Sequence, residues 1–172
     1  GTADAGEEVT VTFADQTLKT KADAKGKWMV KLAALKATKN QQGQSLTVAG
    51  SNTITFDDVL IGEVWLCSGQ SNMAMLVGGS LHAKEEMANA NYPKIRMFRV
   101  KGNKHAREPV TNVNGEWRLG APDTVRWFSA TAYFFGRKLH KDLGVPIGLI
   151  NSSYGGTPAE AWTSGKALEQ HM

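Results

Sequence analysis

The sequence predicts an α/β domain preceded by a smaller all-β segment, and three observations support this. Nearly every side chain in residues 59–67 is apolar, on both phases of a two-residue alternation, which is typical of a parallel-sheet strand covered by helices on both faces. Residues 128–144 have helical apolar spacing and precede a short apolar strand at 147–150, as in a β-α-β unit. Residues 7–55 contain only strands and turns. We therefore expect a partial β-sandwich over 1–56 and a partial three-layer parallel sheet over 57–172.

Composition sets the broad class of protein. The 172 residues are 41% hydrophobic and 8% aromatic, enough for a packed core. The net charge of +4 is carried by dispersed lysines without interleaved aromatics, so we expect no nucleic-acid partner. No apolar run approaches the roughly 18 residues that span a membrane, so we expect no membrane partner either. The turn-like opening over 1–6 suggests a chain cut from a longer precursor.

The first segment is expected to form five short strands, at 9–13, 16–20, 28–32, 45–49 and 52–56. Asp57 and Asp58 mark the passage into the α/β part. Adjacent carboxylates on a strand point to opposite faces, so we interpret this pair as a solvated turn and not as a catalytic pair.

The α/β part is expected to continue with a helix over 81–90 and a strand over 94–100, the neighbour of the first strand. Residues 102–123 have no sustained period and predict a loop. Trp117 in this loop either plugs the edge of the core or offers a platform for a sugar ring. The long helix is expected to begin at Ser129 and to end at Gly144. Its apolar stripe is expected at Ala132, Phe135, Leu139 and Leu143.

Ser71 is the candidate nucleophile. It follows the apolar strand and Gly69, just before a helix-compatible run, which places its hydroxyl at the carboxyl edge of the sheet and near a helix N-terminus. The alternative is that Ser68 or Ser71 merely caps that helix. The segment is not the Gly-x-Ser-x-Gly elbow of the α/β-hydrolases, because Met73 replaces the second Gly. Cys67, the single cysteine, lies inside the strand and is expected to be a small core residue.

Two motifs carry a resemblance to a known family. Residues 61–73, Ile-Gly-Glu-Val-Trp-Leu-Cys-Ser-Gly-Gln-Ser-Asn-Met, are one, and residues 148–162, Gly-Leu-Ile-Asn-Ser-Ser-Tyr-Gly-Gly-Thr-Pro-Ala-Glu-Ala-Trp, are the other. In this order they resemble the sialate O-acetylesterase branch of the SGNH (GDSL-like) hydrolases. The resemblance covers about residues 57–162 and implies an SGNH-like, flavodoxin-like fold.

The resemblance also implies site residues. The Ser71 amide and a donor from Gly155 and Gly156 would form the oxyanion hole, and Gln70 and Asn151 are candidates for a further side-chain donor. The alternative is that the two glycines only turn the chain and Asn151 caps it. Tyr154 stands where the family often has Trp, which affects the details of the acyl or sugar pocket.

The catalytic base is not visible. The family completes its triad with Asp-x-x-His near the carboxyl terminus, and no histidine here has an Asp three positions before it; the four are His82, His105, His140 and His171. We expect all four to be ordinary histidines, and the chain to be a fragment ending before its base. A second chain is the other source considered.

The resemblance thus predicts a carbohydrate O-acetylesterase acting through an acetyl-Ser71 intermediate on a sialic acid or a plant polysaccharide. This fragment alone is expected to be nearly inactive. The alternative is a noncatalytic glycan-binding or structural module. No metal or cofactor is expected, because no ligand cluster has zinc spacing and no phosphate loop is present. Family members are mostly exported, which implies a periplasmic or secreted protein.

Overall fold

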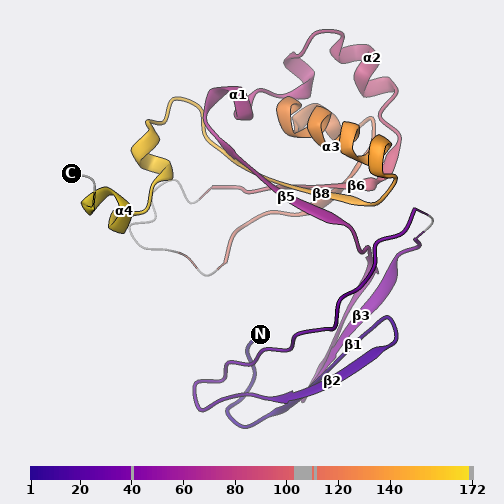
Figure 1. Cartoon of the computed structure of the whole chain (residues 1–172), viewed down its shortest axis with the longest axis vertical. Coiled ribbons are helices and arrows are strands. Elements are labelled where there is room, and N and C mark those ends of the chain that lie inside the picture. Colours follow the sequence, from indigo (N-terminus) through magenta and orange to yellow (C-terminus); the bar gives the residue numbers. More distant parts are fainter. Residues whose placement is uncertain (40, 103–109, 111, 171–172) are drawn as a thin grey trace. The chain divides into compact units, whose positions relative to one another are not determined.

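The computed structural model describes residues 1–39, 41–102, 110 and 112–170. The chain divides into two compact units, Gly1–Gly62 and Glu63–Met172. Among the described residues each unit contains one four-stranded sheet (Figure 1). The two units are described separately below.

The sheet of the first unit is antiparallel throughout. Its strands are β1 (Glu8–Phe13), β2 (Gln16–Lys21), β3 (Gln44–Ala49) and β4 (Thr53–Val59), in the order β2-β1-β3-β4. Alternate side chains of β1 are buried, namely Val9, Val11 and Phe13, as period-two patterning requires. These four strands confirm the antiparallel prediction for 9–20 and 45–56.

Two details of that prediction are wrong. The described residues of this unit form one sheet and not two facing sheets, and 28–32 is not a strand. That segment alternates in hydropathy, but only its first residue is paired among the described residues, because Trp28 and Gly1 exchange two backbone hydrogen bonds. Ala33 beside the segment is held instead by the side chain of Gln16. In addition, Asp57 and Asp58 lie inside β4, so this unit extends to Gly62.

The sheet of the second unit is mixed. Its strands are β5 (Glu63–Gly69), β6 (Tyr92–Arg99), β7 (Trp117–Gly120) and β8 (Ile147–Ser153), in the order β5-β8-β6-β7. β8 is parallel to both β5 and β6, whereas β7 is antiparallel to β6. The expected pairing of 94–100 with the first strand is therefore wrong, because β8 lies between them. The α/β class itself is confirmed.

Helices α1 (Ser71–Ala74), α2 (Ala83–Ala88) and α3 (Ala130–Leu143) lie on one side of this sheet (Figure 1). Three 3₁₀ turns, η1 (Val77–Gly79), η2 (Val125–Trp127) and η3 (Ala159–Trp162), and helix α4 (Gly165–Glu169) complete the unit. The predicted limits of α3 are confirmed. The hydroxyl of Ser129 accepts a hydrogen bond from the Ala132 amide at 3.1 Å, and Gly144 ends the helix at φ 70°.

The core of this unit lies between α3 and the sheet. Gly136 brings the helix so close to β8 that a Cβ there would lie 2.6 Å from a methyl of Leu149. Ile95, Tyr133 and Ile147 are fully buried beside this contact. The buried face of α3 is therefore Ala132, Tyr133 and Gly136, and the predicted stripe is only partly right. Phe135 and Leu143 are exposed, and Phe135 packs edge-on against Trp65.

The expectation that the strand before Ser71 is covered on both faces is wrong for the described residues. β5 is the edge strand of its sheet, and of its side chains only Cys67 is buried. Val64 and Leu66 point away from α3 and are 64% and 69% exposed. Burial raises the pKa of the Cys67 thiol, as expected for a core cysteine.

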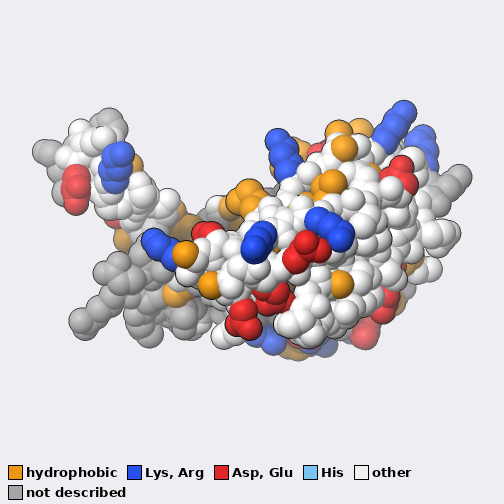
Figure 2. Space-filling view, turned by 90° about the horizontal axis from the view of Figure 1, so that it is seen from below, with side chains coloured by type: hydrophobic (Ala, Val, Ile, Leu, Met, Phe, Trp, Pro, Cys, Tyr) orange, Lys and Arg blue, Asp and Glu red, His pale blue; other side chains and the backbone are white. Residues whose placement is uncertain are grey.

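The charged side chains are interspersed. On the face drawn in Figure 2, Lys and Arg alternate with Asp and Glu and do not gather into a continuous basic patch. Within the described ranges, no helix combines the length and the apolar character needed to cross a membrane.

Candidate active site

Ser71 stands just beyond the carboxyl end of β5. Gly69 ends the strand at φ 141°, a backbone conformation that residues other than glycine rarely adopt. Gln70 then caps α1, and Ser71 is its first residue and is exposed. Because α1 has only four residues, it offers few aligned peptide dipoles, so the contribution predicted from a helix dipole is small.

The side chain of Gln70 is bound to Ser71. Its Oε1 accepts a hydrogen bond from the Ser71 amide at 3.1 Å and another from the Ser71 hydroxyl at 2.7 Å. In this arrangement Gln70 acts toward Ser71 as an acceptor, whereas the sequence suggested a donor. The Ser71 amide, expected in the oxyanion hole, is engaged by the same oxygen.

The glycine pair lies beside Ser71. The amide of Tyr154 donates to the carbonyl of Gly69 at 3.0 Å, which joins the segment after β8 to the last residue of β5. A Cβ on Gly155 would lie 3.6 Å from the Cα of Ser71. Gly156 has φ 80° and no neighbouring atom within 4 Å of its ideal Cβ position. The structure thus brings Ser71 and Gly155 into contact, with open space next to Gly156.

Asn151 is 4% exposed and binds the ends of the two strands together. Its Nδ2 donates to the Cys67 carbonyl at 3.3 Å, and its Oδ1 accepts from the Ser153 hydroxyl at 3.1 Å. A buried amide that is bonded in this way is a structural tie between β5 and β8. The sequence suggested a cap or an oxyanion donor for this residue and did not reveal the tie.

The described histidines are not hydrogen-bonded to Ser71. His140 donates through Nδ1 to the Val145 carbonyl at 2.7 Å, at the far end of α3. The near end of α3 meets α1, where the Ala130 amide donates to the Met75 carbonyl, so His140 is about 15 Å further along the helix axis. His82 precedes α2 in a left-handed conformation. His105 and His171 lie outside the described residues.

A cavity of about 500 Å³ opens beside this site. It is lined by residues that end or follow β6 and β8, among them Arg99, Lys101, Ser153, Tyr154 and Trp162. The indole of Trp162 donates to the Thr157 hydroxyl at 2.8 Å, and that hydroxyl donates to the Tyr154 carbonyl at 2.8 Å. Trp162 closes the second motif quoted above, but the sequence alone assigned it no role.

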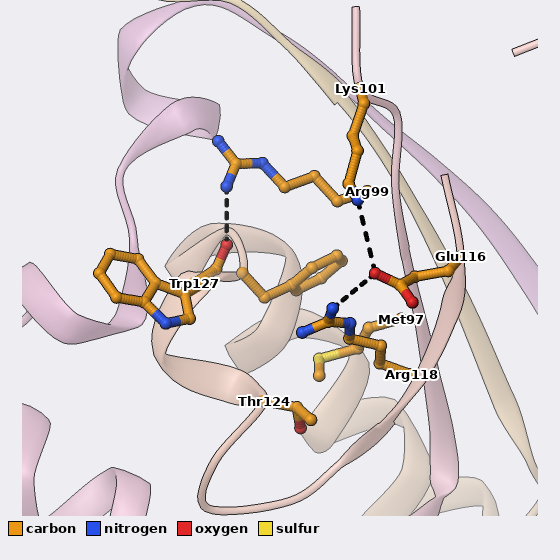
Figure 3. A pocket seen from close by; sticks show the side chains of 8 residues that line it. Met97, Arg99, Lys101, Glu116, Arg118, Thr124 and Trp127 are labelled. Atoms are coloured by element: carbon orange, nitrogen blue, oxygen red, sulfur yellow. Dashed lines mark hydrogen bonds and ion pairs between the residues drawn. The ribbon is translucent and has the colours of Figure 1, made fainter. Parts of the chain in front are cut away.

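A smaller cavity of about 150 Å³ shares Arg99 and Lys101 with the first (Figure 3). Met97 and Phe128 add apolar surface to it. Glu116 binds Arg118 at 2.5 Å and Lys101 at 3.5 Å. The Arg118 guanidinium beside Glu116 lowers the pKa of that carboxyl, so Glu116 is charged at neutral pH. β7, which carries Glu116's neighbours Trp117 and Arg118, was predicted as loop.

Trp117 supports the edge of the sheet. Its ring packs at a tilt against Phe98, with 5.3 Å between the ring centroids, and it also lies against Gly148. It remains half exposed. In the part of the chain that the structure describes, no three His, Cys, Asp or Glu side chains are grouped to hold a metal ion.

The second unit is thus an α/β domain with an exposed serine and a glycine pair at the carboxyl edge of its parallel strands. A family model described as carbohydrate esterase, sialic acid-specific acetylesterase (SASA) matches residues 61–172. The chain belongs to this SASA family.

Relatives and a solved structure agree with this placement. The chain is 41% identical over 125 residues to a sialate O-acetylesterase of Pongo abelii, covering 68% of this chain and 24% of that protein. It is 36% identical over 184 residues to the sialate O-acetylesterase of Rattus norvegicus, covering 98% of this chain and 34% of that protein. A crystal structure of a carbohydrate acetylesterase from Xanthomonas citri matches with a TM-score of 0.91 and 34% identity, covering 98% of this chain and 38% of that one. The chain thus spans about a quarter to a third of the curated relatives it matches.

Proposed function

We propose that the full-length protein hydrolyses O-acetyl esters of carbohydrates, with Ser71 as nucleophile. The observation that carries this proposal is the contact of Ser71 with Gly155 at the carboxyl edge of the sheet, beside a cavity of about 500 Å³. The named activities of the relatives, sialate O-acetylesterase and carbohydrate acetylesterase, support the same reaction class.

The reaction has two steps. The Ser71 hydroxyl oxygen attacks the acetyl carbonyl carbon, its proton passes to a base, and the sugar leaves as an alcohol after taking that proton. Water then attacks the acetyl-serine ester and releases acetate and free Ser71. In both steps, amides at Ser71 and at Gly155 and Gly156 are suited to donate to the developing oxyanion. The Gln70 side chain is exposed, so it is free to rotate and release the Ser71 amide for this purpose.

The base has to come from elsewhere in the full-length protein or from a second chain. Among the described residues the carboxamide of Gln70 is the acceptor of the Ser71 hydroxyl, and a carboxamide is too weak a base to take its proton. His140 is tied to Val145 at the far end of α3.

The test compares the full-length protein with its Ser71→Ala variant on p-nitrophenyl acetate and on O-acetylated sialic acid. We expect Ser71→Ala to lower kcat about 10³-fold or more, and to lose labelling by a serine-directed fluorophosphonate. Ser51→Ala, the same change at an exposed serine of the other unit, serves as the control and should keep both.

Unchanged turnover in Ser71→Ala would contradict the proposal. Binding of O-acetylated sugars without turnover or labelling in the unmodified protein would support the second candidate, a noncatalytic glycan-binding module. The observation that favours this candidate is that, among the described residues, the Ser71 hydroxyl is hydrogen-bonded to Gln70 and not to a histidine.

A further inference from the structure

Two cationic residues lie at the carboxyl end of β6. This strand is separated by β8 alone from β5, the strand that leads to Ser71. Arg99 is the last residue of β6, and Lys101 follows it. β5, β8 and β6 run parallel and in that order, so their carboxyl ends share one edge of the sheet. Since neighbouring strands are about 4.8 Å apart, the end of β6 is roughly 10 Å from the end of β5. A small sugar bridges that distance.

These cations are not neutralised by the carboxylate beside them. Among the described residues, the smaller cavity is lined by three cationic side chains, Arg99, Lys101 and Arg118, but by a single carboxylate, that of Glu116 (Figure 3). Glu116 pairs with Arg118 and Lys101. Arg99 donates only to the uncharged carbonyl of Trp127, at 3.3 Å, and no carboxylate of the described ranges pairs with it. The described residues of this site therefore carry excess positive charge.

The larger cavity combines this charge with features that suit a sugar ring. Its volume of about 500 Å³ falls within the range of small-molecule sites. Trp162 lines it from η3 and is 40% exposed, while its indole N–H is held by Thr157. The apolar C–H face of a sugar packs well on such an oriented aromatic ring. Ser152 and Ser153 at the end of β8 line the same cavity and add polar residues to its wall.

We propose that Arg99 and Lys101 determine specificity by binding the carboxylate of an acidic sugar, while its ring lies against Trp162 and its O-acetyl group reaches Ser71. The planar fork of a guanidinium matches a carboxylate with two parallel hydrogen bonds, which makes Arg99 the principal anchor. Lys101 adds a second charge that it shares with Glu116. This inference rests on the proposed function of Ser71.

The test measures charge preference directly. Full-length protein is given O-acetylated sialic acid and the carboxamide of the same sugar, in which an uncharged amide replaces the carboxylate. The preference is the ratio of the two kcat/KM values. We expect the acid to be preferred about ten-fold or more, as for charge-assisted hydrogen bonds at a partly exposed site.

Four variants are expected to lower, raise or keep this preference for the acid. Arg99→Gln and Lys101→Gln should lower it toward one, with the larger loss for Arg99→Gln. Glu116→Gln should raise it, because Lys101 and Arg118 lose their counter-charge. Arg96→Gln is the matched control, since Arg96 lies on the opposite face of β6 and donates to the Pro93 carbonyl, and it should keep the preference of the unmodified protein.

A preference near one in the unmodified protein, or one that survives Arg99→Gln, would overturn the inference. Turnover is not needed for the decision. Ser71→Ala protein titrated with sialic acid and with its carboxamide should show the same preference in Kd, and Arg99→Gln added to Ser71→Ala should remove it. Failure of the unmodified protein to hydrolyse any acetyl ester would instead count against the proposed function.

Discussion

A glycine pair beside Ser71 can leave space for the substrate or allow a left-handed backbone. Alanine substitutions at Gly155 and Gly156 distinguish these two roles. A Cβ on Gly155 would lie 3.6 Å from the Cα of Ser71 and 3.8 Å from its Cβ, which are ordinary van der Waals contacts. Gly155 also has no left-handed φ. The fold should therefore accept Gly155→Ala with a change in unfolding free energy within about 0.5 kcal/mol.

The effect of Gly155→Ala on activity should be much larger. The acetyl carbon must approach the Ser71 hydroxyl oxygen to about 3–3.5 Å, and the new methyl group occupies space on that side of Ser71. A displacement of the substrate by about 1 Å costs roughly 10²-fold in rate. We expect kcat/KM for an acetyl ester to fall by about that factor.

Gly156→Ala should affect stability more than activity. Gly156 has φ 80°, where an alanine costs roughly 1–2 kcal/mol, but its ideal Cβ position has no neighbour within 4 Å. The variant should be less stable, with a smaller loss of activity at temperatures where it remains folded.

The measurement is urea unfolding followed by tryptophan fluorescence, with kcat/KM determined on the same full-length samples. Full activity in Gly155→Ala would show that the space beside Ser71 is not where the ester reacts. A larger activity loss in Gly156→Ala than in Gly155→Ala, without a loss of stability, would refute the same reasoning.

Two further predictions concern the core of the second unit. Gly136→Ala should destabilise the protein by up to about 2 kcal/mol, because overpacking against Leu149 costs about 1–3 kcal/mol and the gain in helix propensity is about 1 kcal/mol. Gly165→Ala, a helical glycine with no atom within 4 Å of its ideal Cβ position, is the control, and a Gly136→Ala midpoint in urea above that control would contradict the packing. Burial raises the pKa of Tyr133 to about 12, whereas the unfolded phenol ionises near pH 10. Its contribution to stability is therefore complete below about pH 10 and is lost as the pH rises toward 12. Unfolding in urea over this pH range should be less pH-dependent in Tyr133→Phe, and an unchanged slope would be evidence against burial of this ring.

The sequence predicts elements whose signals are local. The caps of α3, Ser129 and Gly144, and the start of strand β8 follow from side chains next to one another in the chain, and the structure has them as expected. The predicted end of that strand at residue 150 is wrong, because β8 continues to Ser153 in register with β5. The position of Ser71 after a strand and a glycine is local in the same sense.

Features that depend on distant partners could not be predicted in this way. The order β5-β8-β6 is set by pairing across the sheet, and nothing within residues 94–100 indicates which strand they join. Residues 28–32 alternate like a strand, but the neighbouring Ala33 is bonded to the side chain of Gln16 and not to the backbone of the edge strand β2. The four residues of β7 are held by β6, and their own composition is that of a loop.

The same distinction between local signals and distant partners applies to the candidate site. Motif resemblance indicated Ser71, Gly155 and Gly156, and the structure brings Ser71 and Gly155 together. The acceptor role of Gln70 and the tie made by Asn151 depend on side-chain orientation, which a motif does not specify. Arg99 and Lys101 were missed as binding candidates because their significance lies in the strand order, which places the end of β6 near Ser71.

The position of β8 in the middle of its sheet has a consequence for biosynthesis. β5 cannot pair until β8 has been made, because Glu63 is opposite Ile147. A ribosome needs roughly 4–16 s for about 80 residues at 5–20 residues per second. During that interval the apolar β5, with Val64 and Leu66, leaves the exit tunnel as an unpaired strand, and a chaperone that binds extended apolar segments would have time to hold it.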